Sequence, residues 1–241
     1  MSNENVVDGL SQVEIDRFIY SISHELRSPL TAVLGMTRIL QEDYGEELGQ
    51  DGKYYLERIN VNAKKMESFF NDLLKFSRVG RIYSPKENIN VYMLIQEIVN
   101  SLSSDKELRE FDVVFEKDLP FVIYERQALR DVFYNLIENA IIFTPRQIKP
   151  KITISHNYEH DEHIFSIEDN GIGIERGNTK KIFKLFERLK DIDVIGNGIG
   201  LSLVEKIIEY YGGRIWLESV RGEGSIFYFT VPKMEENTNE I

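Results

Sequence analysis

The chain contains no cysteine among its 241 residues. This absence excludes disulfide bonds, cysteine-ligated zinc and thiol catalysis. No apolar run approaches the ~18 residues that a membrane-spanning helix needs. The first ten residues, MSNENVVDGL, lack the basic and apolar regions of a signal peptide. We therefore expect a cytoplasmic protein without a membrane segment, whose sensor, where there is one, lies outside this chain.

Basic residues are in the minority, with 29 Lys and Arg against 40 Asp and Glu and a net charge of -11. A surface that binds nucleic acid needs clustered basic side chains, so this balance argues against nucleic acid as a partner. The negative net charge does not exclude ligands that contain phosphate, because backbone N–H groups and metal ions also hold phosphate. The hydrophobic share of 42% is that of a globular protein.

The sequence pattern over residues 11–79 predicts two helices. One break separates them, in the acidic, glycine-containing stretch 42–52. The apolar residues of both helices recur at the steps of three and four that are typical of helical bundles. A hairpin alone would leave these stripes exposed, whereas two hairpins in a four-helix bundle would bury them, so we expect a homodimer. The alternative is that the stripes pack on the rest of the same chain. The stripes are Ile15, Ile19, Ile22, Leu26, Leu30 and Val33 in the first helix and Leu56, Ile59, Ala63, Met66, Phe70 and Leu73 in the second.

The pattern changes in the stretch 77–90, where Gly80 and Pro85 stop helices. Beyond it, half-buried strand patterns and helices with a period of 3.6 indicate an α/β sandwich with a mixed sheet, and an α+β fold overall. We predict a helical hairpin over 11–80, a second, α/β domain over 81–234 and a disordered tail over 235–241. The expected helices are 90–102, 125–144 and 201–213, and the expected strands are 111–120 with its turn, 151–157, 162–169, 213–219 and 225–232.

Two asparagines share one face of the predicted helix 125–144. Asn135 and Asn139 are four residues apart, so both side chains leave the helix on the same side. Asparagine is disfavoured inside helices, and its amide oxygen suits Mg²⁺, which keeps several waters and takes few protein ligands. One such asparagine would be a solvated helix residue, whereas the pair indicates a contact with metal or phosphate.

The stretch IEDNGIGIE (167–175) follows a predicted strand. Asp169 is expected at the strand end, and Gly171 and Gly173 allow close approach of backbone to a ligand. A carboxylate there can accept a hydrogen bond from the exocyclic amino group of adenine, where guanine has an oxygen. Taken alone, the stretch also fits a plain Asp-Asn-Gly turn.

A third stretch, GNGIGLSLVEKI (196–207), runs from a glycine-rich turn into a helix. The first N–H groups of a helix are unpaired and its N-terminus is positive, so phosphate is stabilised there. No predicted strand immediately precedes the turn, which disfavours a Rossmann fold, and the Gly-Lys-Ser/Thr ending of a P-loop is absent.

In this order, the three stretches resemble the N, G1 and G2 boxes of the ATP-binding domain of sensor histidine kinases. IFKLFERL (182–189) is similar to the F box, and SHELRSPLTAVLG (23–35) is similar to the H box of the dimerisation and phosphotransfer hairpin. The resemblance covers roughly residues 11–232, and it implies that 11–80 is the dimerisation and phosphotransfer hairpin and 81–234 the ATP-binding domain. DYGEELGQDGKYYLERI and LLKFSRVGR are nearest in wording to kinases attached to phytochromes and similar cytoplasmic sensors.

The resemblance implies roles for individual residues. His24 would accept the phosphoryl group, with Glu25 as orienter or general base and Ser28 at the position that places a water in phosphatase-active members. Asn139 would be the Mg²⁺ ligand, and Asn135 a neighbouring contact with phosphate or a metal-bound water. The remaining ATP-binding residues would be Phe143, the adenine-selecting Asp169, Gly171, Gly173, Ile174, the phosphate-contacting Arg188, Gly196, Gly198, Gly200 and Leu201, with 187–198 as a mobile lid.

His24 is two residues from Ile22 and two from Leu26, which places it nearly opposite that apolar face, toward solvent or a partner. A neutral imidazole is a competent nucleophile near neutral pH. Pro29 cannot donate to the carbonyl of Glu25, so we expect the helix to bend just past His24 and give the ATP-binding domain access.

The sequence therefore predicts an enzyme that uses ATP and Mg²⁺ to phosphorylate His24 and passes the phosphoryl group to an aspartate of a separate response-regulator receiver. Ser28 has the hydroxyl but not the methyl of threonine, which leaves phosphatase activity open. Two departures from the family are Ile142, where a lysine is usual, and Asn197, where threonine is common.

Two other functions compete with the kinase. The first is a dimeric signalling scaffold that binds ATP without transferring phosphate, and the intact His24, Glu25, Asn139 and Asp169 argue against it. The second is a chaperone- or topoisomerase-type ATPase of the same superfamily. Those proteins lack the histidine-bearing hairpin, and this chain is too short for their further domains.

Overall fold

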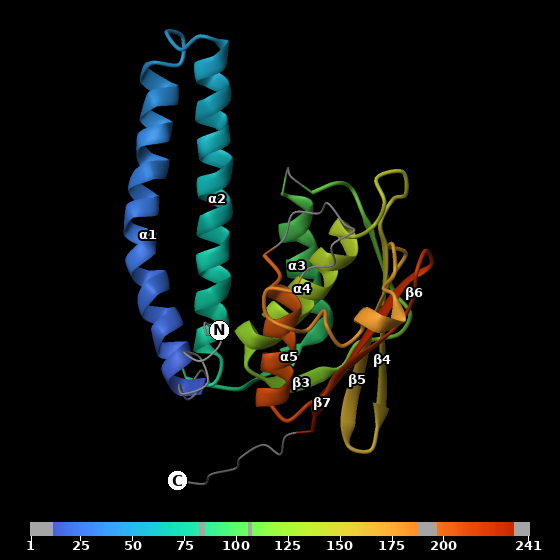
Figure 1. The fold of residues 1–241 in the computed structure, drawn as a ribbon. Helices are drawn as coiled ribbons and strands as arrows, with labels where there is room; N and C mark the ends of the chain where they lie inside the picture. Colours follow the sequence, from blue (N-terminus) through green and yellow to red (C-terminus); the bar gives the residue numbers. More distant parts are fainter. Residues whose placement is uncertain (1–11, 82–84, 106–107, 188–196, 234–241) are drawn as a thin grey trace, which may run out of the picture. The chain divides into compact units, whose positions relative to one another are not determined.

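The structure, a computed structural model, describes residues 12–81, 85–105, 108–187 and 197–233, without the side chains of 12–19, Ser23 and His24. The chain divides into two compact units after Arg81. Figure 1 shows a helical unit in blue and cyan and an α/β unit in green to red. None of the described helices is both long and apolar enough to cross a membrane.

The first unit is a helical hairpin of α1 (Gln12–Asp43) and α2 (Gln50–Arg78). The predicted break over 42–52 is too long, because α1 continues to Asp43 and α2 already starts at Gln50. An i,i+4 ion pair of Arg38 with Glu42 (2.8 Å) supports the last turn of α1. The acidic Asp51 favours a helix start, since a negative charge is stabilised in the first turn.

Helix α1 runs through Pro29 without ending. Proline removes one N–H from the helical ladder, so the chain there depends on other contacts. Thr31 Oγ1 donates to the Arg27 carbonyl (3.0 Å), and the Arg27 guanidinium donates across the hairpin to Asn71 Oδ1 (2.9 Å). The bend expected just past His24 stays a prediction.

The second unit is a five-stranded mixed sheet with helices on one face, which confirms the predicted α+β class (Figure 1). The strand order is β2-β4-β5-β7-β6, with β2 parallel to β4 and the other neighbours antiparallel. Its strands are β2 (Asp112–Phe115), β4 (Lys151–Glu159), β5 (Glu162–Asp169), β6 (Ile215–Val220) and β7 (Gly224–Pro232), and its helices are α3 (Val91–Ser103), α4 (Arg126–Ile142), α5 (Gly200–Tyr210) and the short η1 (Arg176–Asn178).

The core of this unit lies between α4 and the middle of the sheet. Phe133 of α4, Phe165 of β5 and Phe229 of β7 are fully buried, with ring centroids 5.2–5.5 Å apart. Each such aromatic pair contributes about 0.5–1.5 kcal/mol beyond the burial of its area. This cluster fixes α4, which carries both candidate asparagines, against the two strands that lead to Asp169 and Ser225.

A separate two-stranded sheet of β1 (Glu87–Asn90) and β3 (Phe121–Tyr124) was not predicted. Both strands have four residues, too few for an alternating pattern to be recognised. Asn90 also serves a second purpose, because its side chain accepts from the N–H of Met93 (3.0 Å) and caps α3. The polar sequence ENIN therefore combines a strand with a helix start.

Candidate functional site

The two asparagines of α4 lie on the helix face that meets the start of α5. Asn135 Nδ2 donates to the carbonyl of Asp131 (2.7 Å), which orients its amide oxygen away from its own helix. That oxygen would be 2.7 Å from a Cβ at Gly200, so any larger residue at the start of α5 would displace the Asn135 side chain. Asn139 is half-buried, and its amide makes no hydrogen bond to any residue that the structure describes. Its oxygen is available to an external cation.

Asp169 ends β5 with its carboxyl group mostly buried. The N–H groups of Gly171 (2.8 Å) and Ser225 (3.2 Å) both donate to Oδ1. Burial raises the pKa of Asp169 from 3.8 to about 6, and these two hydrogen bonds offset the rise only in part. The carboxyl group is therefore still ionised at pH 7, and no described donor occupies its second oxygen. A carboxylate perturbed in this way is a functional-site candidate.

Two glycines of the loop after β5 are required by the surrounding backbone. A Cβ on Gly171 would lie 2.7 Å from Asp169 Oδ1 and 2.9 Å from the Phe143 carbonyl oxygen. Gly173 has a φ of 65°, and a Cβ there would lie 2.0 Å from the carbonyl oxygen of Val220. The loop therefore packs tightly between the end of α4 and the β6–β7 turn.

Backbone hydrogen bonds join this loop to its neighbours on both sides. The Phe143 carbonyl, just past α4, accepts from the N–H of Ile172 (3.0 Å), and the Ile172 carbonyl accepts from Gly222 (2.7 Å). The N–H of Ile174 donates to Ser219 Oγ (2.7 Å). The loop 170–174 is thus held on both sides by hydrogen bonds within the chain.

The structure brings most of the predicted ATP-binding residues to this end of the α/β unit. Asn135 meets Gly200, Phe143 meets Gly171, and Gly171 meets Asp169. Asn139, Gly173, Ile174, Gly198 and Leu201 belong to the same helices and loops. Arg188, Gly196 and most of the predicted lid 187–198 lie outside the described residues, as does the predicted tail 235–241.

The predicted phosphotransfer residues lie on the other unit. His24, Glu25 and Ser28 are all within α1, and the side chains of Glu25 and Ser28 are exposed. The side chain of His24 lies outside the described part of the chain, so its predicted orientation stays a prediction.

Sequence reasoning missed three side-chain or backbone contributors. Ser219 and Ser225, within the predicted strands 213–219 and 225–232, carried no predicted role although both bond to the site. Arg109, in the segment before β2, donates to the chain leaving α4 and had no local signal. These contacts join residues far apart in the sequence, which no motif spacing reveals.

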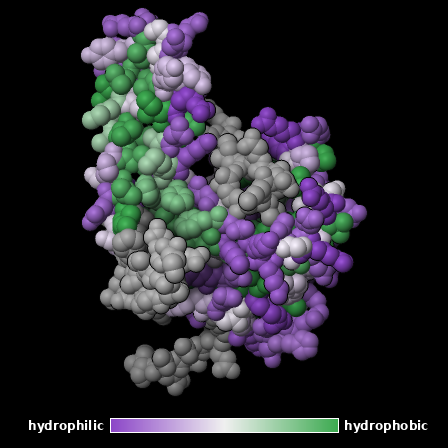
Figure 2. Space-filling view, in the orientation of Figure 1, coloured by the Kyte–Doolittle hydropathy of each residue, from purple (hydrophilic) through white to green (hydrophobic). Residues whose placement is uncertain are grey.

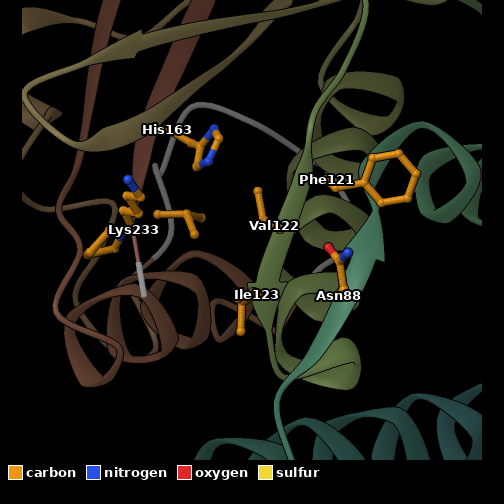
Figure 3. A pocket seen from close by; sticks show the side chains of 8 residues that line it. Asn88, Phe121, Val122, Ile123, His163 and Lys233 are labelled. Carbon is orange, nitrogen blue, oxygen red and sulfur yellow. The ribbon is translucent and has the colours of Figure 1, made fainter. Parts of the chain in front are cut away.

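A pocket at the opposite end of β5 holds none of the predicted residues. His163 lines one side and Asn88, Phe121 and Ile123 the other (Figure 3). His163 Nδ1 is 3.0 Å from His156 Nε2, and burial lowers the pKa of both imidazoles. His163 and Asp169 are six positions apart along β5, which corresponds to roughly 20 Å of strand.

Two family models match the chain. Residues 14–81 match the His Kinase A (phospho-acceptor) domain, and residues 124–235 match the histidine kinase-, DNA gyrase B- and HSP90-like ATPase. A phospho-acceptor hairpin followed by an ATPase domain of this type defines the kinases of two-component signalling.

Known proteins agree with this class. The methanogenesis regulatory histidine kinase FilI of Methanothrix harundinacea is 35% identical over 91% of this chain and 25% of its own length. Cyanobacterial phytochrome B of Nostoc sp. is 35% identical over 92% of this chain and 30% of its own length. Full-length ShkA, crystallised with AMPPNP, has the same fold, with a TM-score of 0.73 at 24% identity over 90% of this chain and 46% of its own.

The chain belongs to the sensor histidine kinases, and its two units match the two domains of their catalytic core. It spans about a quarter to a third of the length of the two curated relatives above.

Replacement of Asp169 tests the buried carboxylate. Asp169→Asn keeps an oxygen for the N–H groups of Gly171 and Ser225 but places an amide donor where the second carboxyl oxygen stood. We expect the variant to lose ATP binding and yet to unfold at a higher temperature than wild type at pH 7 in the absence of nucleotide. The gain is at most about 3 kcal/mol, from the pKa difference between the folded and unfolded chain.

The stability that Asp169→Asn gains over wild type should depend on pH, because the pKa of Asp169 is higher in the folded chain than in the unfolded chain. The raised pKa means that native protein holds a proton on Asp169 between 3.8 and about 6 that the unfolded chain has released. Stability therefore falls as pH rises through this window, and the full penalty applies above it. Thermal unfolding of wild type and Asp169→Asn from pH 4 to 8 measures how the difference in stability changes with pH. A variant that is less stable than wild type at pH 7, or that binds ATP normally, contradicts the expectation.

Proposed function

We propose that this core binds Mg²⁺-ATP at the Asp169 end of the α/β unit, phosphorylates His24 and donates the phosphoryl group to an aspartate of a separate response regulator. The observation that carries the proposal is the convergence of α4, the loop 170–174 and the start of α5 around Asp169, Asn135 and Asn139, in a chain whose hairpin carries His24. The matched family models support the nucleotide-binding and phospho-acceptor parts of the proposal.

Recognition of ATP would use both ends of this site. The second carboxyl oxygen of Asp169 accepts from the adenine amino group, and guanine presents no donor at that position. The first turn of α5, beside Asn135, offers unpaired N–H groups to phosphate. The crystal structure of ShkA in complex with AMPPNP supports a nucleotide in this fold.

Asn139 fits the requirement for a Mg²⁺ ligand. Its amide is half-buried and has no partner among the described residues, and one oxygen ligand suffices for an ion that keeps waters and phosphate oxygens. When bound, Mg²⁺ would neutralise charge on the phosphates during transfer. The chain's part is to hold one ligand oxygen in a fixed position on α4.

The transfer step would form a P–N bond between the γ-phosphorus and a ring nitrogen of His24. The bond from the γ-phosphorus to the bridging oxygen breaks, and ADP leaves with the electron pair. Glu25, exposed on the same helix, would orient the ring and take the proton that the other ring nitrogen releases. The phosphohistidine would then donate its phosphoryl group to an aspartate of the receiver. A cytoplasmic location of the chain fits both the supply of ATP and such a partner.

Homodimerisation would complete the hairpin. Leu56, Ala63 and Phe70 are buried, whereas Ile59 and Met66 of the same stripe are 48% and 50% exposed. Figure 2 shows hydrophobic residues gathered along the hairpin, and an apolar groove lies between the two helices. Its lining is Leu26, Pro29, Leu30, Val33, Ile59, Asn62, Ala63, Met66 and Phe70. A second hairpin has the complementary stripe, so a four-helix bundle would bury both.

Labelled phosphate tests the kinase directly. Incubation with γ-labelled ATP and Mg²⁺ should give wild type an acid-labile, alkali-stable label, as expected for phosphohistidine. His24→Ala should abolish the label, because the acceptor is gone, and Asn139→Ala should reduce it by at least about 100-fold through loss of phosphate positioning.

Matched controls are available elsewhere in the chain. His160→Ala, at an exposed histidine, and Asn157→Ala, at an exposed asparagine, should label like wild type. Wild type that binds ATP but gains no label would instead favour the signalling scaffold that does not transfer phosphate.

Dimerisation is tested by placing charge in the groove. Ile59→Glu with Met66→Glu should raise the dimer dissociation constant at least about 100-fold, because an unpaired charge is costly to bury. Light scattering after size exclusion should show a mass of twice 28.1 kDa for wild type and 28.1 kDa for the variant. Val114→Glu, on an exposed site of the other unit, should remain dimeric. A monomeric wild type at micromolar concentration would refute the dimer.

Phosphatase activity is tested at Ser28. Ser28→Ala should slow dephosphorylation of the response regulator by about tenfold or more, because the hydroxyl that positions water is lost. Phosphorylation of His24 should persist. Ser21→Ala, exposed on the same helix, is the control. Equal regulator dephosphorylation by all three proteins would remove this role from Ser28.

A further inference from the structure

Arg109 holds the chain that leaves α4. Its guanidinium donates to four backbone carbonyl oxygens, all within the eight residues 141–148. The acceptors are Ile141 (3.1 Å), Thr144, Pro145 (2.7 Å) and Ile148 (3.0 Å). We call this set of hydrogen bonds the Arg109 clamp. It connects the segment before β2 to the end of the helix that carries the two asparagines.

The end of α4 explains why a guanidinium is needed. The last four carbonyls of a helix lack partners within it, and α4 has no basic residue in its last turn. Thr144 Oγ1 satisfies the carbonyl of Ala140 (2.7 Å), and Arg109 satisfies that of Ile141. Arginine has five planar N–H donors and a fixed positive charge, which is favourable at a helix C-terminus. Lysine has the charge but not the planar set of donors.

The Arg109 clamp holds the turn at Phe143, which connects α4 to the loop 170–174 of the proposed nucleotide site. Phe143 lies between two clamped residues, Ile141 and Thr144. Its N–H donates to the Asn139 carbonyl (2.9 Å), and its own carbonyl accepts from Ile172 (3.0 Å). A shift of this turn would therefore move the proposed metal ligand and the loop 170–174 relative to each other.

The far end of the same segment is tied to that loop as well. The Asn170 side chain donates to the Lys149 carbonyl (3.0 Å) and accepts from the N–H of Lys151 (2.8 Å). Lys149 also pairs with Glu110 and Asp112, although these exposed ion pairs contribute little. Segment 141–151 is thus held by Arg109 on one side and by the Asp169 loop on the other.

We infer that Arg109 is a positioning residue of the ATP site, acting through the turn at Phe143 rather than by contact with the nucleotide. The inference rests on the proposed binding of ATP near Asp169. It assigns to the segment before β2 a part in the kinase reaction that no sequence motif indicates. The competing explanation is that Arg109 only stabilises the fold.

The experiment compares Arg109→Lys and Arg109→Ala with Arg126→Gln in the full chain. Arg126 begins the same helix and pairs with Glu97 (2.7 Å), so its loss removes an ion pair of α4 away from the site. The dissociation constant of Mg²⁺-ATP and the unfolding temperature without nucleotide are measured for each protein. Millimolar guanidinium chloride, against equal sodium chloride, tests rescue of Arg109→Ala.

We expect both Arg109 variants to weaken ATP binding at least tenfold, with partial rescue of Arg109→Ala by guanidinium. Arg126→Gln should bind ATP within twofold of wild type. Normal ATP affinity in folded Arg109 variants would overturn the inference, and so would a loss that appears equally in Arg126→Gln. Failure of wild type itself to bind ATP would refute the proposed function instead.

Amide hydrogen exchange decides the matter if Arg109→Ala does not fold or ATP does not bind. In Arg109→Lys, the N–H groups of Phe143 and Ile172 should exchange at least tenfold faster than in wild type. The N–H of Leu136, inside α4, should be unchanged. Unaltered exchange at Phe143 and Ile172 would show that the Arg109 clamp does not hold the turn at Phe143.

Discussion

The burial of a charged carboxylate at the end of β5 is the constraint around which the α/β unit is organised. Asp169 gives up solvation there, and the N–H groups of Gly171 and Ser225 return only part of the cost, as its raised pKa shows. The arrangement persists because the aromatic core fixes α4, β5 and β7 to one another. A ligand that donates a hydrogen bond to the second oxygen therefore relieves an unfavourable feature of the free protein.

The two units meet the need for a hydrophobic core in different ways. The α/β unit buries Phe133, Phe165 and Phe229 completely within its own residues. The hairpin leaves half of Ile59 and Met66 exposed, so its apolar stripe remains incomplete in one chain. The proposed nucleotide site thus belongs to the unit with its own buried core, and the proposed acceptor His24 to the unit whose stability should depend on association.

Sequence reasoning located the parts of the site that depend on local spacing. Asn135 and Asn139 share a face because a helix repeats every 3.6 residues, and Asp169 and Gly171 meet because they flank one turn. It missed Ser219, Ser225 and Arg109, which reach the site through strand pairing or from a distant segment. It also missed β1 and β3, because four-residue strands carry no periodic signal. Local motifs therefore indicated the candidate site residues, while the contacts that hold them became visible only in the fold.

The departure at Ile142 becomes intelligible in these terms. The family usually has a lysine at this position, near the end of α4. A positive charge is favourable there, because the C-terminus of a helix carries partial negative charge. Ile142 is half-buried, and the last turn of α4 contains no basic residue. Arg109 supplies that charge from a different segment and reaches the carbonyl of Ile141 directly. The end of α4 thus receives a positive charge from a distant segment, which the local sequence around Ile142 cannot reveal.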